Sequence, residues 1–358
     1  MNNNGFGSSP IRTYKKQSGP NGLRTVLVLL MTAVIIAAVV IFVMSMTGTG
    51  MFADKKGGGP AVTTTEDAPE TTPPESTTPE QSTTPGDIVD PNGVRYTFIK
   101  KTSAAIGKGD LLLINTDNLY KFTEEDMLEE IYKVSPYFEV NDSGFELKYS
   151  TVAQLKLLAE GYYNEVSGAY KLLLMDAYRT FDKQNGYHQS NPNGAVPAGA
   201  SDYHSGATIN LKSWNTQEGK VQALSTDNGS GWLKQHAYEY GFIFRSPASK
   251  ESIVGFSIDW QLRYVGVPHA EYMFINNLCL EEYLTKLSTD HRFSTDGSNA
   301  LTIECVDGNT YQVYYVEGTT EEGVDINVAV PSNRRYTISG DNITGFIVTV
   351  VVEEAVAN

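Results

Sequence analysis

The sequence predicts an α+β protein with a small C-terminal β-hairpin appendage, preceded by a transmembrane helix and a disordered linker. Strand-like and helix-like segments are mixed without regular alternation over residues 96–290, which favours α+β. Residues 291–358 show alternating apolar positions and a hairpin signal, which predict a separate set of hairpins. An unbroken apolar stretch and a Thr/Pro/Glu-rich stretch come before both regions.

Residues 25–47 carry no charged side chain. A helix of this length rises about 1.5 Å per residue, enough to span a hydrocarbon core of about 30 Å. A cleavable signal peptide is the alternative, but its apolar region is usually about 7–15 residues long, and no small-x-small cleavage site follows here. The bases before the stretch place residues 1–24 in the cytoplasm as a tail. These bases are Arg12, Lys15, Lys16 and Arg24. We therefore expect a single-pass protein of the cell membrane with its main domain outside.

Residues 48–95 form the expected linker. Within them, residues 57–93 contain seven acids and neither a base nor an aromatic residue. Such a segment cannot bury enough apolar surface to fold, and its prolines and like charges keep it extended. The whole chain has a formal net charge of −15, which repels nucleic acid. We therefore expect a tether and no nucleic-acid partner.

Several helices and strands can be predicted within residues 96–290. A helix is predicted from an N-cap at Ser150 to about Ser167, because apolar residues recur at helical spacing. The other expected elements are a strand at 110–115, a central strand at 171–175, a helix at 232–240 ended by Gly241, a strand at 242–245, and a last helix from Pro268 to about 287.

The appendage is expected from alternating Leu301, Ile303 and Cys305, a turn at Asp307-Gly308, and a strand near 346–352. The chain has two cysteines, Cys279 and Cys305. Buried free thiols are the favoured interpretation. A single disulfide between them is the alternative outside the cell.

Several short motifs occur in a fixed order along residues 96–290. They are Tyr178-Arg179 followed by Gln184, Ala195-Val196-Pro197 with Gly199-Ala200-Ser201, Trp232-Leu233 with Tyr240-Gly241-Phe242 and Arg245, Arg263-Tyr264-Val265-Gly266, and Leu280-Glu281-Glu282-Tyr283-Leu284. Together they resemble the VanY-type D-alanyl-D-alanine carboxypeptidases, zinc peptidases of the LAS type that trim peptidoglycan stems. The resemblance implies a carboxypeptidase-like core at a bacterial cell wall.

The resemblance also locates the positions of the family's chemistry, and all four are changed. Tyr203 stands at the first His ligand, Asn210 at the Asp ligand, Gln261 at the second His ligand and Ile258 at the general-base Glu. Trp260 keeps its place beside Gln261. A catalytic zinc needs imidazole, thiolate or carboxylate ligands. A phenol with a pKa of about 10 and two neutral amides are poor replacements. We therefore predict no zinc, although the family uses it, and no intact catalytic residue.

The resemblance implies substrate contacts at Tyr178, Arg179, Gln184, Ser201 and Trp260. An arginine suits a peptide carboxylate, but an ion pair at a strand end is an equal alternative for Arg179. A rearranged metal site built from His204, Asp259 and His269 is a weaker alternative.

Three functions follow from these observations. The first is a pseudopeptidase that binds a peptidoglycan stem peptide or a cell-wall protein without hydrolysis. The second is an active D,D- or L,D-carboxypeptidase with a displaced metal. The third is a non-catalytic interaction module that uses the C-terminal β region.

Overall fold

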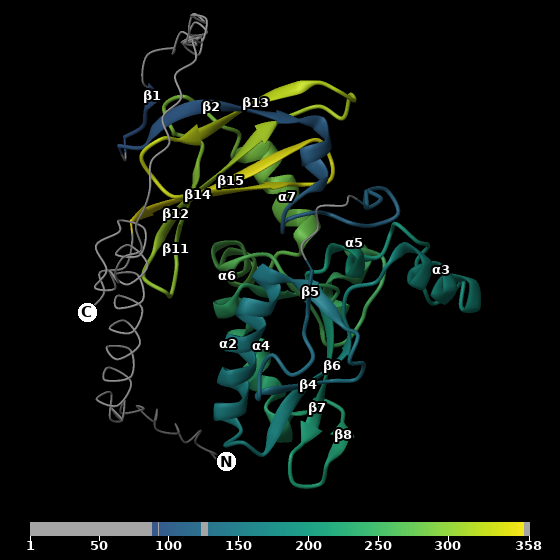
Figure 1. The fold of residues 1–358 in the computed structure, drawn as a ribbon. Helices are drawn as coiled ribbons and strands as arrows, with labels where there is room; N and C mark the ends of the chain where they lie inside the picture. The colour runs from purple at the N-terminus through teal and green to yellow at the C-terminus, as the bar shows by residue number, and fades with distance from the viewer. Residues whose placement is uncertain (1–87, 92, 123–127, 354–358) are drawn as a thin grey trace, which may run out of the picture. The chain divides into compact units, whose positions relative to one another are not determined.

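The computed structural model describes residues 88–353, apart from residue 92 and residues 123–127 (Figure 1). All of these residues belong to one compact unit that begins at Thr78. The predicted membrane helix and nearly all of the predicted linker lie outside the described residues. Within the part of the chain that is described, no helix has the length and apolar character needed to cross a bilayer.

A mixed six-stranded sheet forms the centre of what we call the α/β lobe, residues 128–264. Its order is β4-β6-β7-β10-β9, with β8 paired to β7. Only the β4–β6 pair is parallel. The strands are β4 (Phe138–Val140), β6 (Tyr170–Asp176), β7 (Thr208–Asn215), β8 (Lys220–Gln222), β9 (Phe242–Phe244) and β10 (Gln261–Tyr264). The predicted central strand at 171–175 is therefore confirmed as β6.

Helix α2 (Tyr149–Glu165) covers this sheet with one apolar stripe. Its buried residues are Thr151, Val152, Leu155, Leu158, Ala159 and Tyr162. The predicted stripe is confirmed. The predicted N-cap at Ser150 is wrong, because the helix begins two residues earlier than expected, at Tyr149, and Lys148 occupies the N-cap without a side-chain bond.

The remaining short elements frame the ends of the sheet. They are a two-stranded sheet of β3 (Leu128–Glu130) and β5 (Glu146–Lys148), helices α3 (Phe181–Ser190), α4 (Ser230–His236) and α5 (Glu251–Val254), and 3-10 turns η1 (Ser103–Gly107), η2 (Asp202–Ser205), η3 (Thr226–Asn228), η4 (Ala237–Tyr240) and η5 (Ala248–Lys250). The predicted helix at 232–240 corresponds to α4 and η4. It ends at Gly241, whose φ of 81° fits a glycine after a helix.

The predicted last helix is two helices, α6 (Val267–Ile275) and α7 (Leu280–Asp290). Pro268 lies in the first turn of α6, as expected. The break follows because Asn277 takes a left-handed φ of 52°. The backbone N–H of Cys279 then donates to Glu282 Oε2 at 2.9 Å, which caps the start of α7.

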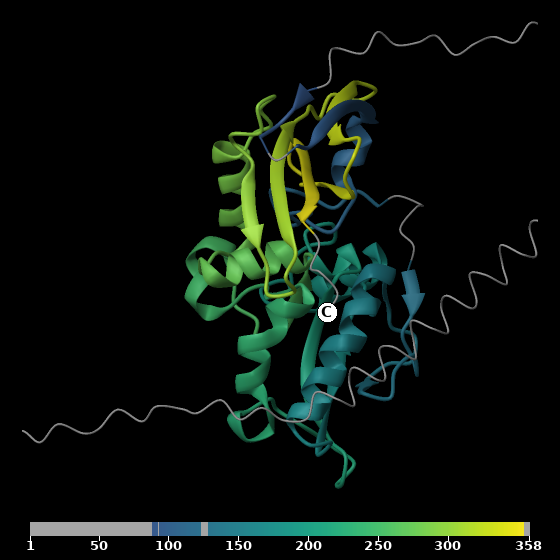
Figure 2. The same cartoon turned by 90° about the vertical axis from the view of Figure 1, so that its left-hand side faces the viewer.

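The C-terminal lobe consists of two antiparallel sheets, and Figures 1 and 2 show it beside the α/β lobe from two directions. One sheet has the order β11-β12-β15-β14 and the other β1-β2-β13. The strands are β1 (Ile88–Val89), β2 (Arg95–Thr102), β11 (Leu301–Glu304), β12 (Thr310–Glu317), β13 (Asp325–Pro331), β14 (Tyr336–Gly340) and β15 (Gly345–Glu353). The predicted hairpin and final strand are confirmed. Strand β2, near the first of the described residues, also belongs to this lobe because it pairs with β13.

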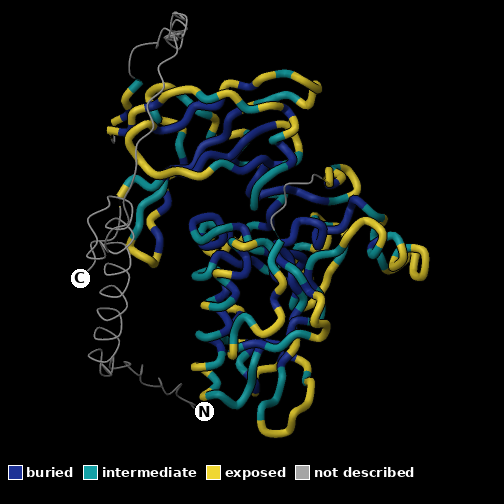
Figure 3. Tube along the Cα trace, viewed as in Figure 1, coloured by how far each residue is buried: buried dark blue, intermediate teal, exposed yellow. Residues whose placement is uncertain are grey.

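Residues 110–115 do not form the predicted strand. Leu111, Leu112, Leu113 and Ile114 are buried, as their apolar run indicated. Their backbone is satisfied by the C-terminal lobe: Leu111 N donates to Ser339 Oγ at 2.9 Å and Leu113 N to Asp341 O at 2.9 Å. Figure 3 shows buried segments both in the α/β lobe and in these sheets.

Candidate functional site

The pairing of β7 with β10 brings together two of the positions at which this sequence departs from the family motif. Gln261 and Asn210 are directly opposed on these antiparallel strands. Turn η2 precedes β7 and carries Tyr203. Gly206 ends this turn with a φ of 66°, and a Cβ there would lie 2.9 Å from Leu128. A larger residue at this position would be strained in conformation and in space.

A cleft of about 930 Å³ opens beside these residues. Helices α3 and α5, both labelled in Figure 1, contribute to its walls. All four altered positions line it: Tyr203, Asn210, Ile258 and Gln261. Three of the predicted substrate contacts, Arg179, Gln184 and Ser201, line it as well. The motif frame therefore surrounds one cavity of ligand size.

Tyr203 and Gln261 lie close together in the lining of the cleft. Both side chains are buried. The Gln261 side chain lies near the Tyr203 phenol, and its Oε1 accepts from Ser246 Oγ at 2.7 Å. Burial, with a contribution from the Asp176 carboxylate, raises the pKa of Tyr203 above its usual value. The phenol therefore stays protonated at neutral pH.

Arg179 is held in a fixed position above Tyr203. Its guanidinium carbon lies 4.2 Å from the centre of the Tyr203 ring and 4.6 Å from that of Tyr187. Its Nε donates to Asp176 Oδ2 at 3.1 Å, Nη2 donates to the same oxygen, and Nη1 donates to Gln184 Oε1 at 2.7 Å. Because a guanidinium has five N–H groups, two remain for a ligand.

The donor set does not fit zinc. Asn210 donates from Nδ2 to the backbone oxygen of Asp259 at 3.1 Å, and the Gln261 oxygen is engaged with Ser246. Tyr203 would have to lose a proton that burial holds in place. None of the three brings a negative charge to offset dehydration of a divalent cation. Ile258, 37 % exposed, brings an apolar side chain instead of a general base.

A buried network of ion pairs lies beside the cleft and is centred on Asp202, one of the lining residues. Asp202 Oδ1 lies 2.7 Å from Arg263 Nη1 and 3.3 Å from Arg245 Nε. Arg245 also pairs with Glu281 of α7 at 2.8 Å. Burial acts to raise the pKa of Asp202, but Arg263 and Arg245 outweigh it and lower this pKa below the usual range. The charged carboxylate therefore links η2 to β10 through Arg263 and to the residue after β9 through Arg245, which in turn pairs with α7.

Two predicted substrate contacts lie elsewhere. Trp260 packs against Phe244 at a ring distance of 5.8 Å, and Lys234 lies over its ring. Trp260 has a left-handed φ of 60° and immediately precedes β10. The first residue of β10, Gln261, lines the cleft. Tyr178 donates its backbone N–H to Glu146 O at 3.1 Å and is not among the lining residues.

The residues of the predicted rearranged metal site do not come together. His204 is engaged at both ring nitrogens, with Arg179 O at 2.6 Å and Gly199 N at 3.0 Å. His269 contacts Tyr283 and Thr349 in another part of the fold. Asp259 is exposed. Among residues 88–353, with the stated gaps, no group of three or more His, Cys, Asp or Glu side chains could hold a metal ion.

Sequence reasoning missed several residues of the site. Asp176 and Tyr187 position Arg179, Ser246 fixes Gln261, and Asp202 anchors the turn. Asp176 could have been found at the carboxyl end of β6, three residues before Arg179. No local pattern marks Ser246 or Asp202, because their partners are distant in sequence.

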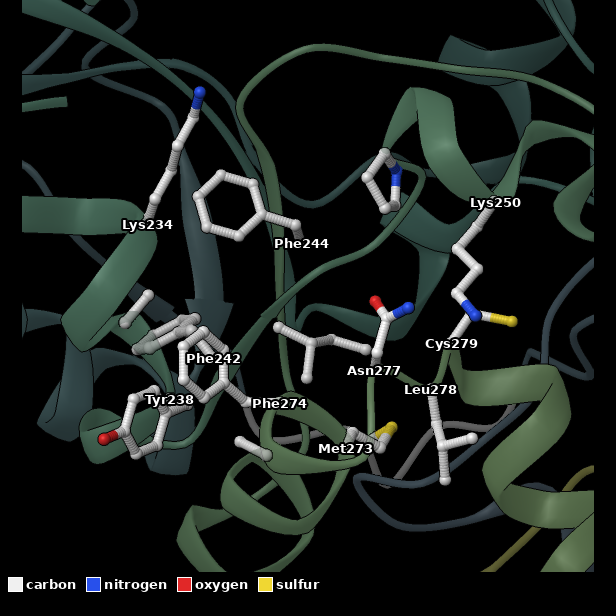
Figure 4. A pocket seen from close by; sticks show the side chains of 14 residues that line it. Lys234, Tyr238, Phe242, Phe244, Lys250, Met273, Phe274, Asn277, Leu278 and Cys279 are labelled. Atoms are coloured by element: carbon white, nitrogen blue, oxygen red, sulfur yellow. The ribbon is translucent and has the colours of Figure 1, made fainter. Parts of the chain in front are cut away.

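A second, smaller cavity of about 170 Å³ lies between η4, β9 and α6 and shares no lining residue with the cleft (Figure 4). It is mainly apolar. The rings of Tyr238 and Phe274 stack at 4.2 Å beside it. It contains none of the altered motif positions.

The fold and the cleft define a protein of mixed α/β architecture built like a zinc peptidase. The VanY family model, described as D-alanyl-D-alanine carboxypeptidase, matches residues 147–267. A D-alanyl-D-alanine carboxypeptidase of Enterococcus faecium is 32 % identical over 261 residues, covering 70 % of this chain and 77 % of that protein. One of Enterococcus faecalis is 32 % identical over 139 residues, covering 35 % and 49 %.

Among solved structures, the vancomycin resistance D,D-dipeptidase VanXYg, in complex with a D-Ala-D-Ala phosphinate analog, is similar in fold. Its TM-score is 0.60 at 23 % identity, and the match covers 72 % of this chain and 99 % of that one. The chain belongs to the VanY family of D-alanyl-D-alanine carboxypeptidase-like proteins.

Proposed function

We propose that this protein binds a peptidoglycan stem peptide in the cleft and does not hydrolyse it. The observation that carries the proposal is that neutral side chains, Tyr203, Asn210 and Gln261, stand at the family's ligand positions in the lining of the cleft, two of them already bonded to protein groups. Without a bound metal, a water molecule there keeps a pKa near that of bulk water, and Ile258 stands where the family's general-base carboxylate would take its proton.

The peptide is favoured as ligand by the walls of the cleft. Arg179 keeps two N–H groups after its bonds to Asp176 and Gln184, and such a fork can donate to a peptide carboxylate. Its stacking between Tyr187 and Tyr203 fixes the fork before a ligand arrives, which lowers the entropic cost of binding. The relatives are described by their action on D-alanyl-D-alanine, which agrees with this ligand class.

The proposal includes the place where the protein works. Residues 25–47 would anchor the chain in the cell membrane, and the Thr/Pro/Glu-rich segment would carry the domain outward toward the wall. Protease added to intact cells should remove the domain and leave an N-terminal fragment in the membrane. A domain that stays protected until the cells are lysed would contradict this location.

The decisive experiment is a titration of the full-length protein with a synthetic stem pentapeptide ending in D-Ala-D-Ala, with zinc present. We expect saturable binding by calorimetry and no release of D-alanine. Arg179→Ala should weaken binding about tenfold or more, because a charged hydrogen bond is lost. Arg334→Ala, an exposed arginine outside the cleft, is the matched control. Release of D-alanine by the unaltered protein would overturn the proposal.

A further inference from the structure

Arg179 lies on residues 177–180, a connection without regular structure between β6 and α3. Turn η2 holds the backbone of this connection. The N–H of Arg179 donates to Tyr203 O at 3.4 Å, and the carbonyl oxygen of Arg179 accepts from His204 Nδ1 at 2.6 Å. The place of the guanidinium in the cleft therefore depends on His204 as well as on the partners of the guanidinium itself.

His204 also contacts a second segment, residues 196–199, beside the cleft. Its Nε2 accepts from the backbone N–H of Gly199 at 3.0 Å. Because a carbonyl oxygen only accepts and a backbone N–H only donates, the two partners require a neutral imidazole with its proton on Nδ1. The side chain is completely buried, so both bonds are shielded from solvent. One imidazole thus links the backbone of Arg179 to that of Gly199.

Gln184 makes a second link between Arg179 and the same segment. Its Oε1 accepts from Arg179 Nη1 at 2.7 Å, and its Nε2 donates to Val196 O at 2.7 Å. Arg179 is therefore joined to residues 196–199 twice, through its backbone by His204 and through its guanidinium by Gln184. Since Arg179 and Val196 both line the cleft, these links hold two parts of its wall in one arrangement.

The His204 ring is itself fixed by its surroundings. It stacks on Tyr120 at a ring distance of 6.1 Å, and Phe122 packs edge-on against it at 4.7 Å. The backbone N–H of Tyr120 donates to Gly199 O at 2.8 Å. Gly199 has a left-handed φ of 92°, which favours glycine. Gly199 is thus held at both its N–H and its carbonyl group, next to an imidazole that packing keeps in place.

We propose that His204 is a positioning residue that holds the Arg179 fork and residues 196–199 in the arrangement that receives the carboxylate of a ligand. His204 does not line the cleft, so it acts through Arg179. A fork fixed before the ligand arrives loses less entropy on binding. The inference rests on the proposed function and deepens it, since it makes affinity for the peptide carboxylate depend on a side chain outside the cleft.

The first test measures hydrogen exchange at Gly199 in the full-length protein without ligand. His204→Leu removes the acceptor for this N–H and should speed its exchange about fivefold or more, as loss of one hydrogen bond predicts. His204→Gln should keep the exchange slow, because an amide can donate to Arg179 O and accept from Gly199 N. His269→Leu is the matched control, since His269 is also buried and bonded at both ring nitrogens but lies outside the cleft.

The second test compares two stem pentapeptides, one with a free C-terminal carboxylate and one with a C-terminal amide. His204→Leu should weaken binding of the carboxylate peptide about fivefold and that of the amide peptide by less than about twofold, because the loss acts through the Arg179 fork. His204→Gln should restore the affinity, and His269→Leu should leave it unchanged. In an Arg179→Ala background, His204→Leu should have no further effect on either peptide.

The outcomes separate this inference from the proposed function. Unchanged Gly199 exchange in His204→Leu, or equal weakening of both peptides in a protein that binds them, would overturn the inference alone. An unaltered protein that binds neither peptide would overturn the proposed function, and exchange at Gly199 would still judge the link through His204. If His204→Leu does not fold, His204→Phe replaces it, because it keeps a ring beside Tyr120 and Phe122 and removes both hydrogen bonds.

Discussion

Gln261 of β10 and Asn210 of β7 are Cα partners across an antiparallel pair, and both carry neutral amide side chains. Gln261 is tied to Ser246, and Asn210 to the backbone of Asp259. The strand pair therefore presents two neutral side chains, each with a protein partner, at neighbouring positions of the cleft lining.

This relationship predicts that zinc binding can be restored in stages. The triple variant Tyr203→His, Asn210→Asp, Gln261→His should take up one zinc per chain, measured by elemental analysis after dialysis, whereas the unaltered protein should take up none. The imidazole and carboxylate groups supply the ligands that the present side chains lack.

Adding Ile258→Glu to that variant should then produce release of D-alanine from a stem pentapeptide. A general base contributes a factor of about 10² to 10⁴, so the quadruple variant should exceed the triple variant by that margin. Stoichiometric zinc in the unaltered protein would show that the altered residues still bind the metal.

Local patterns predicted those parts of the fold that depend on neighbours in sequence. The apolar stripe of α2, the buried run of β6 and the turn at Asp307-Gly308 all have local signals and all are present. The break between α6 and α7 was missed because Asn277 takes a left-handed conformation that its identity permits but does not require. Residues 110–115 were misassigned because their backbone partners lie more than 200 residues away.

The same distinction applies to the cleft. The order of motifs placed Tyr203, Asn210, Ile258 and Gln261 around one cavity, and the structure has them there. The motif order did not reveal that Trp260 packs against Phe244, away from the lining, because that depends on the turn of the chain before β10. It also did not reveal the partners of Asp202.

Asp202→Asn should lower the free energy of unfolding by about 3–5 kcal/mol, because it leaves two buried arginines without their shared carboxylate. Denaturant unfolding measures the change. Asp290→Asn is the control. It removes the carboxylate of an exposed ion pair with Lys286 on α7, and it should lower the free energy of unfolding by about 1 kcal/mol or less. Similar losses in the two variants would show that the buried network does not stabilise the fold.

Stability should fall as the pH decreases below about 6.5. Burial lowers the pKa of His269 to about 3, whereas an unfolded histidine has a pKa of about 6.5. Between these values the unfolded chain binds the proton and the folded chain does not, so acidification favours unfolding. The loss attributable to His269 between pH 7 and pH 5 is about 2 kcal/mol.

Unfolding free energies at both pH values for the unaltered protein and for His269→Gln measure this contribution. Glutamine can still hydrogen-bond, but it does not titrate, so the variant should lose less stability on acidification. His204, whose pKa is also lowered by burial, acts in the same direction in both proteins. An identical pH dependence in the two proteins would mean that His269 is not buried as a neutral side chain.

Both cysteines should resist thiol reagents in the folded protein. Cys279 and Cys305 are free and only 2 % and 8 % exposed. Burial raises the pKa of Cys279 to about 11 and raises that of Cys305 as well, so almost no thiolate is present at pH 8. A chromogenic disulfide reagent should therefore label neither residue quickly, and denaturant should release two thiols per chain without reductant. Cys279→Ala should release one. Two thiols that appear only after reduction would establish a disulfide instead, and rapid labelling of the folded protein would contradict the burial of both side chains.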